Sequence, residues 1–174
     1  MSPVETYFRL VNDIHQADGA APAPRYYSVL ADLLNAIGQQ LNPKVGCVLR
    51  LKEIGQALPD GGLFTIDQFP KSDGVPQISR FPTSPPSRGA IELGSTADEL
   101  FSLAYSQPID KHLGQDRHVL VSNFRGFVLM GLESGDKPTE LESFVLAENE
   151  VEFWLLIANH AIWPIRMAIG SPIT

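Results

Sequence analysis

Cysteine, a surplus of basic residues and long apolar runs are missing from this sequence, and each absence excludes a class of protein. Cys47 is the only cysteine, so no internal disulfide framework or multi-cysteine zinc site can form. Its apolar neighbours in VGCVL predict a core thiol and not a nucleophile. No apolar run approaches the roughly 20 residues that a membrane-spanning helix needs, and no basic start with an apolar core opens the sequence. We therefore expect a cytoplasmic protein that does not enter a membrane.

The charge of the chain is acidic. Its 174 residues include 20 acidic and 13 basic side chains, for a net charge of −7 at pH 7. A protein that coats duplex nucleic acid normally has a basic surplus, so bulk charge gives no argument for nucleic-acid binding, although a small basic cleft stays compatible with it. The contents of 44% apolar and 19% charged residues are ordinary. Length and composition predict one folded domain.

The hydrophobic pattern predicts a mixed β-sheet flanked by helices. Residues 70–88 contain five prolines and read as a surface excursion. Thr96 followed by Glu99 matches a capping box at the start of a helix that Pro108 disturbs. The other expected helices cover 3–16, 26–41 and 148–162, and the expected strands cover 45–49, 62–66, 90–93, 118–122, 127–132 and 143–146. This order has no regular β-α-β-α alternation with a glycine-rich phosphate loop.

Two carboxylates stand at the ends of expected strands. Asp60 opens a hairpin in ALPDGGLF, and Glu92 lies in the apolar run AIEL. A buried, ionised carboxylate is costly unless it has a cation, good hydrogen bonds or a metal. Two converging acids make an oxygen-ligand site for Mg²⁺, which polarises a phosphoryl oxygen and activates water. In the alternative interpretation, Glu92 pairs with Arg88 or another base, and Asp60 is a turn aspartate that bonds the backbone.

The residues around these acids resemble a known motif. Pro59-Asp60 followed by Glu92-x-Gly94 is similar to the PD-(D/E)XK nuclease motif, with glycine in place of its final lysine. The ordered blocks RYYSVLADLLNAIG, LNPKV, LPDGGLFTIDQF, RGAIEL, VLVSNFRGFVLMG and LESFVLAENEVEFW resemble the N-terminal segment that precedes large adenine-specific DNA methyltransferases of the single-chain restriction-modification type. The similarity covers about residues 25–155. It implies an α/β, restriction-endonuclease-like fold.

The resemblance also implies an organisation and partners. Residues 25–163 would form the nuclease-like domain, after an N-terminal helix and linker (1–24) and before a tail (164–174). Its substrate would be double-stranded DNA. The chain has no glycine-rich methyl-donor loop and no Asn/Asp-Pro-Pro-aromatic motif. A methyltransferase or target-recognition subunit would therefore act as a partner, and a homo-oligomer stays open.

Carried over residue by residue, the resemblance assigns a site. Asp60 and Glu92 match the metal-binding acids, the Leu93 carbonyl would complete the coordination of Mg²⁺ or Mn²⁺, and Gln107 falls where related nucleases carry a glutamine. Gln107 reads equally well as an exposed helix residue. Gly94 replaces a lysine that holds the attacking water and stabilises charge on phosphorus, which predicts weak or absent cleavage. The candidate cations that would replace it are Lys44, Lys52, Arg88 and Arg125. Arg88 is attractive because it lies four residues before Glu92 on the same strand, but it reads more readily as the solvent-facing end of that strand.

Other polar residues have two interpretations. The residues expected to contact DNA are Lys44, Arg88, Asn123 and Arg125. Asn123 and Arg125 lie in a turn between two core strands, where asparagine is also favoured for its own backbone contacts.

The four histidines, His15, His112, His118 and His160, show no paired metal spacing and read as packing or surface residues. The function predicted from the whole is a degenerate Mg²⁺-dependent endonuclease, and the alternative is a non-catalytic DNA- or protein-binding module of the same fold.

Overall fold

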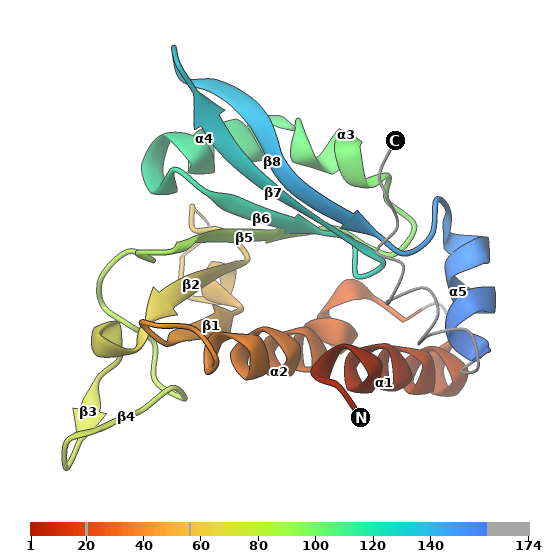
Figure 1. The fold of residues 1–174 in the computed structure, drawn as a ribbon, viewed down its shortest axis with the longest axis horizontal. Helices are drawn as coiled ribbons and strands as arrows, with labels where there is room; N and C mark the ends of the chain where they lie inside the picture. The colour runs from red at the N-terminus through yellow and green to blue at the C-terminus, as the bar shows by residue number, and fades with distance from the viewer. Residues whose placement is uncertain (20, 56, 160–174) are drawn as a thin grey trace.

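A six-stranded mixed sheet with helices on both faces forms the centre of the molecule (Figure 1). This fold is seen in a computed structural model that describes residues 1–19, 21–55 and 57–159. The strand order is β1-β2-β5-β6-β7-β8, and only the pair β5–β6 is parallel. Because parallel neighbours need a crossover connection, the chain leaves the sheet after β5 and returns through α3 and α4. The expected mixed α/β sheet is confirmed.

The bounds of the elements follow the predicted order closely. The strands are β1 (Val45–Leu49), β2 (Gly61–Thr65), β3 (Lys71–Ser72), β4 (Val75–Pro76), β5 (Gly89–Leu93), β6 (Val119–Ser122), β7 (Gly126–Glu133) and β8 (Lys137–Val145). The helices are α1 (Pro3–Asp18), α2 (Tyr27–Gly38), α3 (Leu100–Ala104), α4 (Gln107–Asp116) and α5 (Glu150–Ala158). Three short 3₁₀ helices are η1 (Ala23–Tyr26), η2 (Leu51–Glu53) and η3 (Ile66–Gln68). The β3–β4 ribbon projects from the body within the expected surface excursion (Figure 1).

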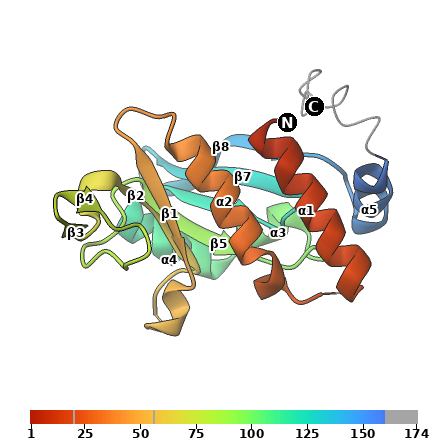
Figure 2. The ribbon, with the colours of Figure 1, turned by 90° about the horizontal axis from the view of Figure 1, so that it is seen from below.

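Helices α1 and α2 cover one face of the sheet (Figure 2). Tyr7, Phe8 and Val11 of α1 are buried in one core with residues of α2, the sheet and α5. The Tyr7 hydroxyl donates a hydrogen bond to the Phe124 carbonyl at 2.8 Å. Helix α1 therefore shares a hydrophobic core with α2, the sheet and α5. The expected tail, 164–174, lies outside the described residues.

Helices α3 and α4 cover the opposite face of the sheet (Figure 1). Successive side chains of a strand point to opposite faces. Along β5, Ala90 packs in the core under α3 and α4, while Ile91 packs in the core under α1 and α2. Glu92 follows with the same alternation and so faces the α4 side. This alternation places an acid between a buried strand and a helix.

Helix α4 was not predicted, because Pro108 was interpreted as a disturbance. Pro108 instead occupies the second position of α4, where its missing N–H has no helical partner to lose. The expected capping box also differs from the structure. Helix α3 begins at Leu100, and its N-cap is Glu99, whose carboxylate accepts hydrogen bonds from the Phe101 and Ser102 amides. Thr96 is buried outside the helix.

The start of one strand and the start of one helix also differ from the prediction. Strand β8 begins at Lys137, earlier than the predicted start at 143, as an edge strand in an eight-residue antiparallel register with β7. Helix α5 begins after the N-cap Asn149, and predicted positions 160–162 lie outside the described residues. Within the described part of the chain, no helix is both long and apolar enough to cross a membrane.

The loop between β6 and β7 is held by a buried arginine. Arg125 is only 5% exposed, and its guanidinium donates four hydrogen bonds, to the carbonyls of Thr96, Asp98, Ala147 and Glu148. Asn123 donates to the Asp98 carbonyl at 2.9 Å and accepts from the Arg125 amide at 3.2 Å. These contacts tie the segment after β5 to the segment after β8. Neither side chain is placed to meet a DNA phosphate, contrary to the expectation, and the turn interpretation describes them correctly.

The Arg125→Ala change should destabilise the fold strongly. Four carbonyls, those of Thr96 and Ala147 in buried residues, would lose a charged donor, and we expect the free energy of unfolding to fall by about 3 kcal/mol. Urea denaturation measures the change, with Arg80→Ala, in the exposed excursion, as the matched control. Equal denaturation midpoints for the two variants would contradict the role given to Arg125.

Candidate active site

Strand pairing brings Asp60 and Glu92 together. Strands β2 and β5 are antiparallel and pair Gly61 with Ile91, so the residues directly before Gly61 and after Ile91 lie at the same end of the two strands. The amide of Leu93 donates a hydrogen bond to Asp60 Oδ2 at 2.8 Å. Both acids are only 8% exposed. Two carboxylates are thus buried side by side at the end of paired strands.

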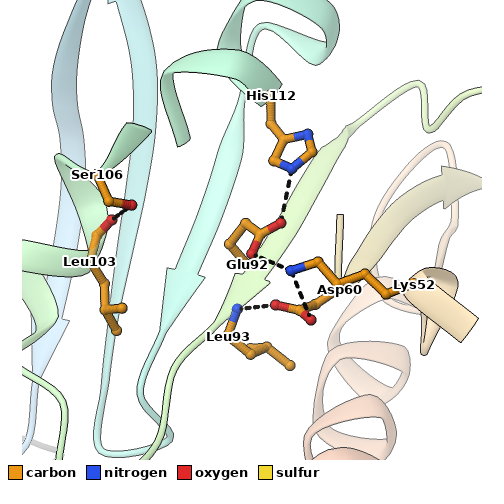
Figure 3. Close-up of polar contacts among 7 residues, drawn as sticks. All are labelled: Lys52, Asp60, Glu92, Leu93, Leu103, Ser106 and His112. Atoms are coloured by element: carbon orange, nitrogen blue, oxygen red, sulfur yellow. Dashed lines mark hydrogen bonds and ion pairs between the residues drawn. The ribbon is translucent and has the colours of Figure 1, made fainter. Parts of the chain in front are cut away.

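Lys52 bridges the two carboxylates (Figure 3). Its Nζ lies 3.0 Å from Glu92 Oε2 and 3.2 Å from Asp60 Oδ1. The lysine comes from η2, the 3₁₀ turn that follows β1, and the amide of the preceding residue, Leu51, donates to the Asp60 carbonyl at 3.1 Å. The basic partner of Glu92 is therefore Lys52 and not Arg88. A cation between two acids offsets the repulsion and the desolvation that would otherwise destabilise them.

His112 closes the site from the side of α4. Its Nε2 lies 3.0 Å from Glu92 Oε1 (Figure 3), and the imidazole is 4% exposed. The two atoms touch without hydrogen-bond geometry, and Glu92 Oε1 is buried without a hydrogen-bond partner among the described residues. The other ring nitrogen of His112, Nδ1, is also buried without a partner there. The sequence analysis gave His112 as a packing or surface residue and did not predict its contact with Glu92. That contact depends on α4, which was not predicted.

The electrostatics of the cluster shift three groups. Burial, together with the charge of Asp60, raises the pKa of Glu92 to about 7, although Lys52 opposes the rise. Burial lowers the pKa of His112, and the charges of Lys111 and Lys52 lower it further. Burial alone lowers the pKa of Lys52, but its bonds to Glu92 and Asp60 outweigh burial and raise it. Near neutral pH the site therefore contains a charged lysine, a neutral histidine and a glutamic acid close to its titration midpoint.

The other predicted site residues lie apart from the acids. Gln107 is the exposed first residue of α4, and His112 of the same helix reaches Glu92 instead. Arg88 precedes β5 by one residue, so four residues and about 13 Å of extended strand separate it from Glu92. Lys44 precedes β1, which pairs with β2 from Val45↔Thr65 to Leu49↔Gly61. Lys44 therefore lies at the opposite end of the strand from the acids.

Packing explains why residue 94 is a glycine. A Cβ at Gly94 would stand 2.3 Å from Leu103 Cδ1 and 2.8 Å from Asp98 Oδ2. Leu103 packs against the core under α3 and α4, and Asp98 Oδ2 accepts a hydrogen bond from the Ser95 amide at 2.7 Å. The space that a motif lysine would need is occupied by these two residues.

The oxygen atoms of this cluster fit a hard divalent cation. Mg²⁺ prefers one or two carboxylates and keeps several water ligands. Asp60 and Glu92 supply the carboxylates, and Glu92 Oε1 has no donor of its own. The Leu93 N–H points to Asp60, and in an extended strand the carbonyl of the same residue points to the same edge. In the described part of the chain, no group of three His, Cys, Asp or Glu side chains is arranged for a metal.

The fold is similar to part of a much longer chain. A cryo-EM structure of a DrdV–DNA complex contains a chain that superposes with a TM-score of 0.50 at 17% sequence identity. The match covers 89% of this chain and 13% of that chain. No family model matches the sequence, and no curated protein matches it. At this identity the likeness supports the fold alone, a single α/β domain with a mixed sheet flanked by helices.

Stability should depend on pH through Glu92. The folded protein holds the Glu92 proton more tightly than the unfolded chain, because its pKa is raised to about 7, so Glu92 stabilises the fold at acidic pH and this contribution is lost as pH rises from about 5 to about 8. After allowance for solvent screening we expect a loss of about 1–2 kcal/mol. Urea denaturation at several pH values should give a flatter profile for Glu92→Gln, whereas exposed Glu142→Gln should follow the wild type. Parallel profiles for all three proteins would contradict the shift.

A methyl group at Gly94 should destabilise the protein. Gly94→Ala forces Leu103 or Asp98 to move, and overpacking of this kind costs about 1–3 kcal/mol. Gly114 is the matched control, because it lies in α4 with nothing within 4 Å of an added Cβ. Alanine is the better helix former, so Gly114→Ala should stabilise by up to about 1 kcal/mol. Thermal denaturation compares the two, and an equal gain from both variants would refute the packing argument.

Proposed function

We propose that this chain is a DNA-directed nuclease domain of a restriction-modification system. The observation that carries the proposal is the pair of buried acids, Asp60 and Glu92, at the end of two paired strands with a cation beside them. The resemblance of the sequence blocks and the structural likeness to a chain from a DrdV–DNA complex support a DNA-related role. The substrate is double-stranded DNA, and the reaction is hydrolysis of a phosphodiester.

The proposed metal ligands are Asp60, Glu92 and the carbonyl of Leu93. A bound Mg²⁺ or Mn²⁺ would polarise a phosphoryl oxygen and lower the pKa of a water molecule. The chain holds these ligands in place before metal arrives. The Leu93 amide orients Asp60 through its 2.8 Å hydrogen bond, and His112 limits the positions open to Glu92 by its contact from α4.

Glu92 links this proposed activity to pH. A carboxylate binds a cation only when it is deprotonated, and the pKa of Glu92 is raised to about 7. Metal binding must therefore displace the Glu92 proton below neutral pH. The site is expected to load metal more readily at pH 8 than at pH 6.

The exposed cations Lys44 and Arg88 remain candidates for contact with the DNA backbone. Lys44 precedes β1 and Arg88 precedes β5. The β1–β2 and β2–β5 pairings place both residues at the same edge of the sheet, at the strand ends opposite the acids. Phosphate contacts of this kind position a duplex without reading its sequence. A methyltransferase or target-recognition subunit would then supply sequence specificity.

A second candidate function is a non-catalytic DNA- or protein-binding module. The observation that favours it is the ion-pair cluster itself, because Lys52 already stabilises both acids without a metal. In that case the cluster serves only to hold β1, β2 and β5 together. Binding of DNA or protein would then survive the loss of both acids.

Cleavage of supercoiled plasmid in Mg²⁺ or Mn²⁺ tests the proposed function. We expect nicking by the wild type and a fall of at least about 100-fold in Asp60→Asn and Glu92→Gln, since the metal ligands support the charge of the transition state. Asp67→Asn and Glu142→Gln are the controls, because both acids are exposed and lie away from the cluster. Cleavage that persists in Asp60→Asn and Glu92→Gln would instead assign the activity to a contaminant or another site.

A further inference from the structure

The position of Lys52 suggests more than an ion-pair partner. Its Nζ lies within 3.2 Å of both acids, yet its side chain is 44% exposed, whereas the Asp60 and Glu92 side chains are 11% and 10% exposed. The lysine therefore reaches the cluster from its solvent-facing side. If Asp60 and Glu92 hold a metal ion, a phosphate that binds this ion would approach from the same solvent-facing side and meet the Lys52 ammonium.

The turn that carries Lys52 is built to hold it there. Arg50 has a left-handed backbone, with φ 65°, and its guanidinium lies 5.5 Å above the Tyr27 ring of α2. Arg50 also forms an ion pair with Glu53 at 2.8 Å, and the Leu51 amide bonds the Asp60 carbonyl. Lys52 lies between these anchored residues. The backbone that carries Lys52 is thus fixed beside the acids, and only its side chain has to turn from the carboxylates to a phosphate.

Position 94, after the end of β5, does not supply such a cation. Residue 94 is two residues after Glu92, so its side chain would point to the same face of β5. Leu103 and Asp98 already fill that space. The sequence motif therefore lacks a lysine at position 94, but in the structure Lys52 contacts both acids.

We propose that Lys52 is the catalytic cation of this site, supplied from the turn after β1 in place of a side chain at position 94. This inference rests on the proposed nuclease function. Lys52 would contact the phosphate under attack and the attacking water, while Asp60 and Glu92 bind the metal. Its present bonds to both carboxylates are the resting state from which it turns to the phosphate.

The reaction that Lys52 would assist is a balanced hydrolysis. The oxygen of a water molecule forms a bond to phosphorus, and the bond from phosphorus to one deoxyribose oxygen breaks with its electron pair on that oxygen. The water gives one proton to solvent, and the leaving oxygen takes one from solvent. The ammonium stays protonated throughout and stabilises the extra negative charge on the phosphoryl oxygens. Loss of one such pre-organised donor typically slows a reaction about 100- to 1000-fold.

None of the other candidate cations is placed for this task. Arg125 is buried among backbone carbonyls. Lys44 and Arg88 lie at the opposite ends of their strands. Of the four residues considered as replacements for a lysine at 94, Lys52 is the one that contacts both acids.

Two measurements on Lys52→Met separate a catalytic role from a structural one. Plasmid nicking in Mg²⁺ should fall at least about 100-fold, while binding of Mn²⁺ alone, followed by electron paramagnetic resonance, should be as tight as in the wild type or tighter, because a competing cation is gone. Lys137→Met, on the far edge strand β8, is the control and should match the wild type in both measurements.

Each outcome decides the inference. Wild-type nicking by Lys52→Met would overturn the role of Lys52 and leave the proposed function standing. Joint loss of nicking and Mn²⁺ binding would make Lys52 a structural support for the acids and also overturn the inference. An inactive wild type would overturn the proposed function and this inference together.

Chemical rescue provides an independent test. Lys52→Cys followed by 2-bromoethylamine restores an ammonium on a chain of nearly lysine length, and should recover at least about 10-fold of the lost nicking rate, since the charge is returned to its place. Iodoacetamide, which adds a neutral group, should recover nothing. Cys47 does not interfere, because it is buried and its pKa is raised to about 12. Equal recovery with both reagents would show that bulk and not charge is needed, and would overturn the proposal.

Discussion

The repulsion between two buried carboxylates is the constraint around which this fold is arranged. Asp60 and Glu92 are drawn together by the β2–β5 pairing, and neither is free to move into solvent. Lys52 neutralises them from the turn after β1, and the Leu93 amide satisfies Asp60. The remaining cost is visible in Glu92, whose pKa is raised to about 7. Replacing a buried ion-pair cluster with well-packed apolar residues is often neutral or stabilising, so stability alone does not account for this cluster.

Four segments of the chain converge at these acids. The β1 turn contributes Lys52, the β2 and β5 ends contribute the carboxylates, and α4 contributes His112 (Figure 3). The crossover from β5 to β6 is what places α4 above Glu92. The same crossover packs Leu103 against position 94 and so removes the space for a side chain there. One topological feature thus both completes the site with a histidine and prevents the strand from supplying a lysine.

The sequence was sufficient to predict the mixed sheet and the convergence of its two acids, because both follow from strand patterns and their turns. It was not sufficient for α4, since a proline at the second helical position has the same appearance as a helix breaker. The contact of His112 with Glu92 was missed for that reason. Arg88 was considered for its nearness to Glu92 in sequence, but the extended strand carries it away and it is exposed, as its solvent-facing interpretation predicted. Lys52 instead reaches Glu92 through the β1–β2 pairing. Arg125 looked exposed in a turn, and only the packed structure shows four carbonyls around it.

The acidic charge of the chain is compatible with a DNA substrate once the local charge of the site is considered. Charges farther apart than about 10 Å are largely screened at 0.1 M salt, so the net charge of −7 matters less to a phosphate than the groups at the cluster. With Glu92 ionised, one lysine faces two carboxylates, and the site has one excess negative charge that repels a phosphate. A divalent cation at the acids reverses that sign. Under the proposed function, metal and DNA therefore bind with positive coupling, and each raises the affinity for the other by the same factor.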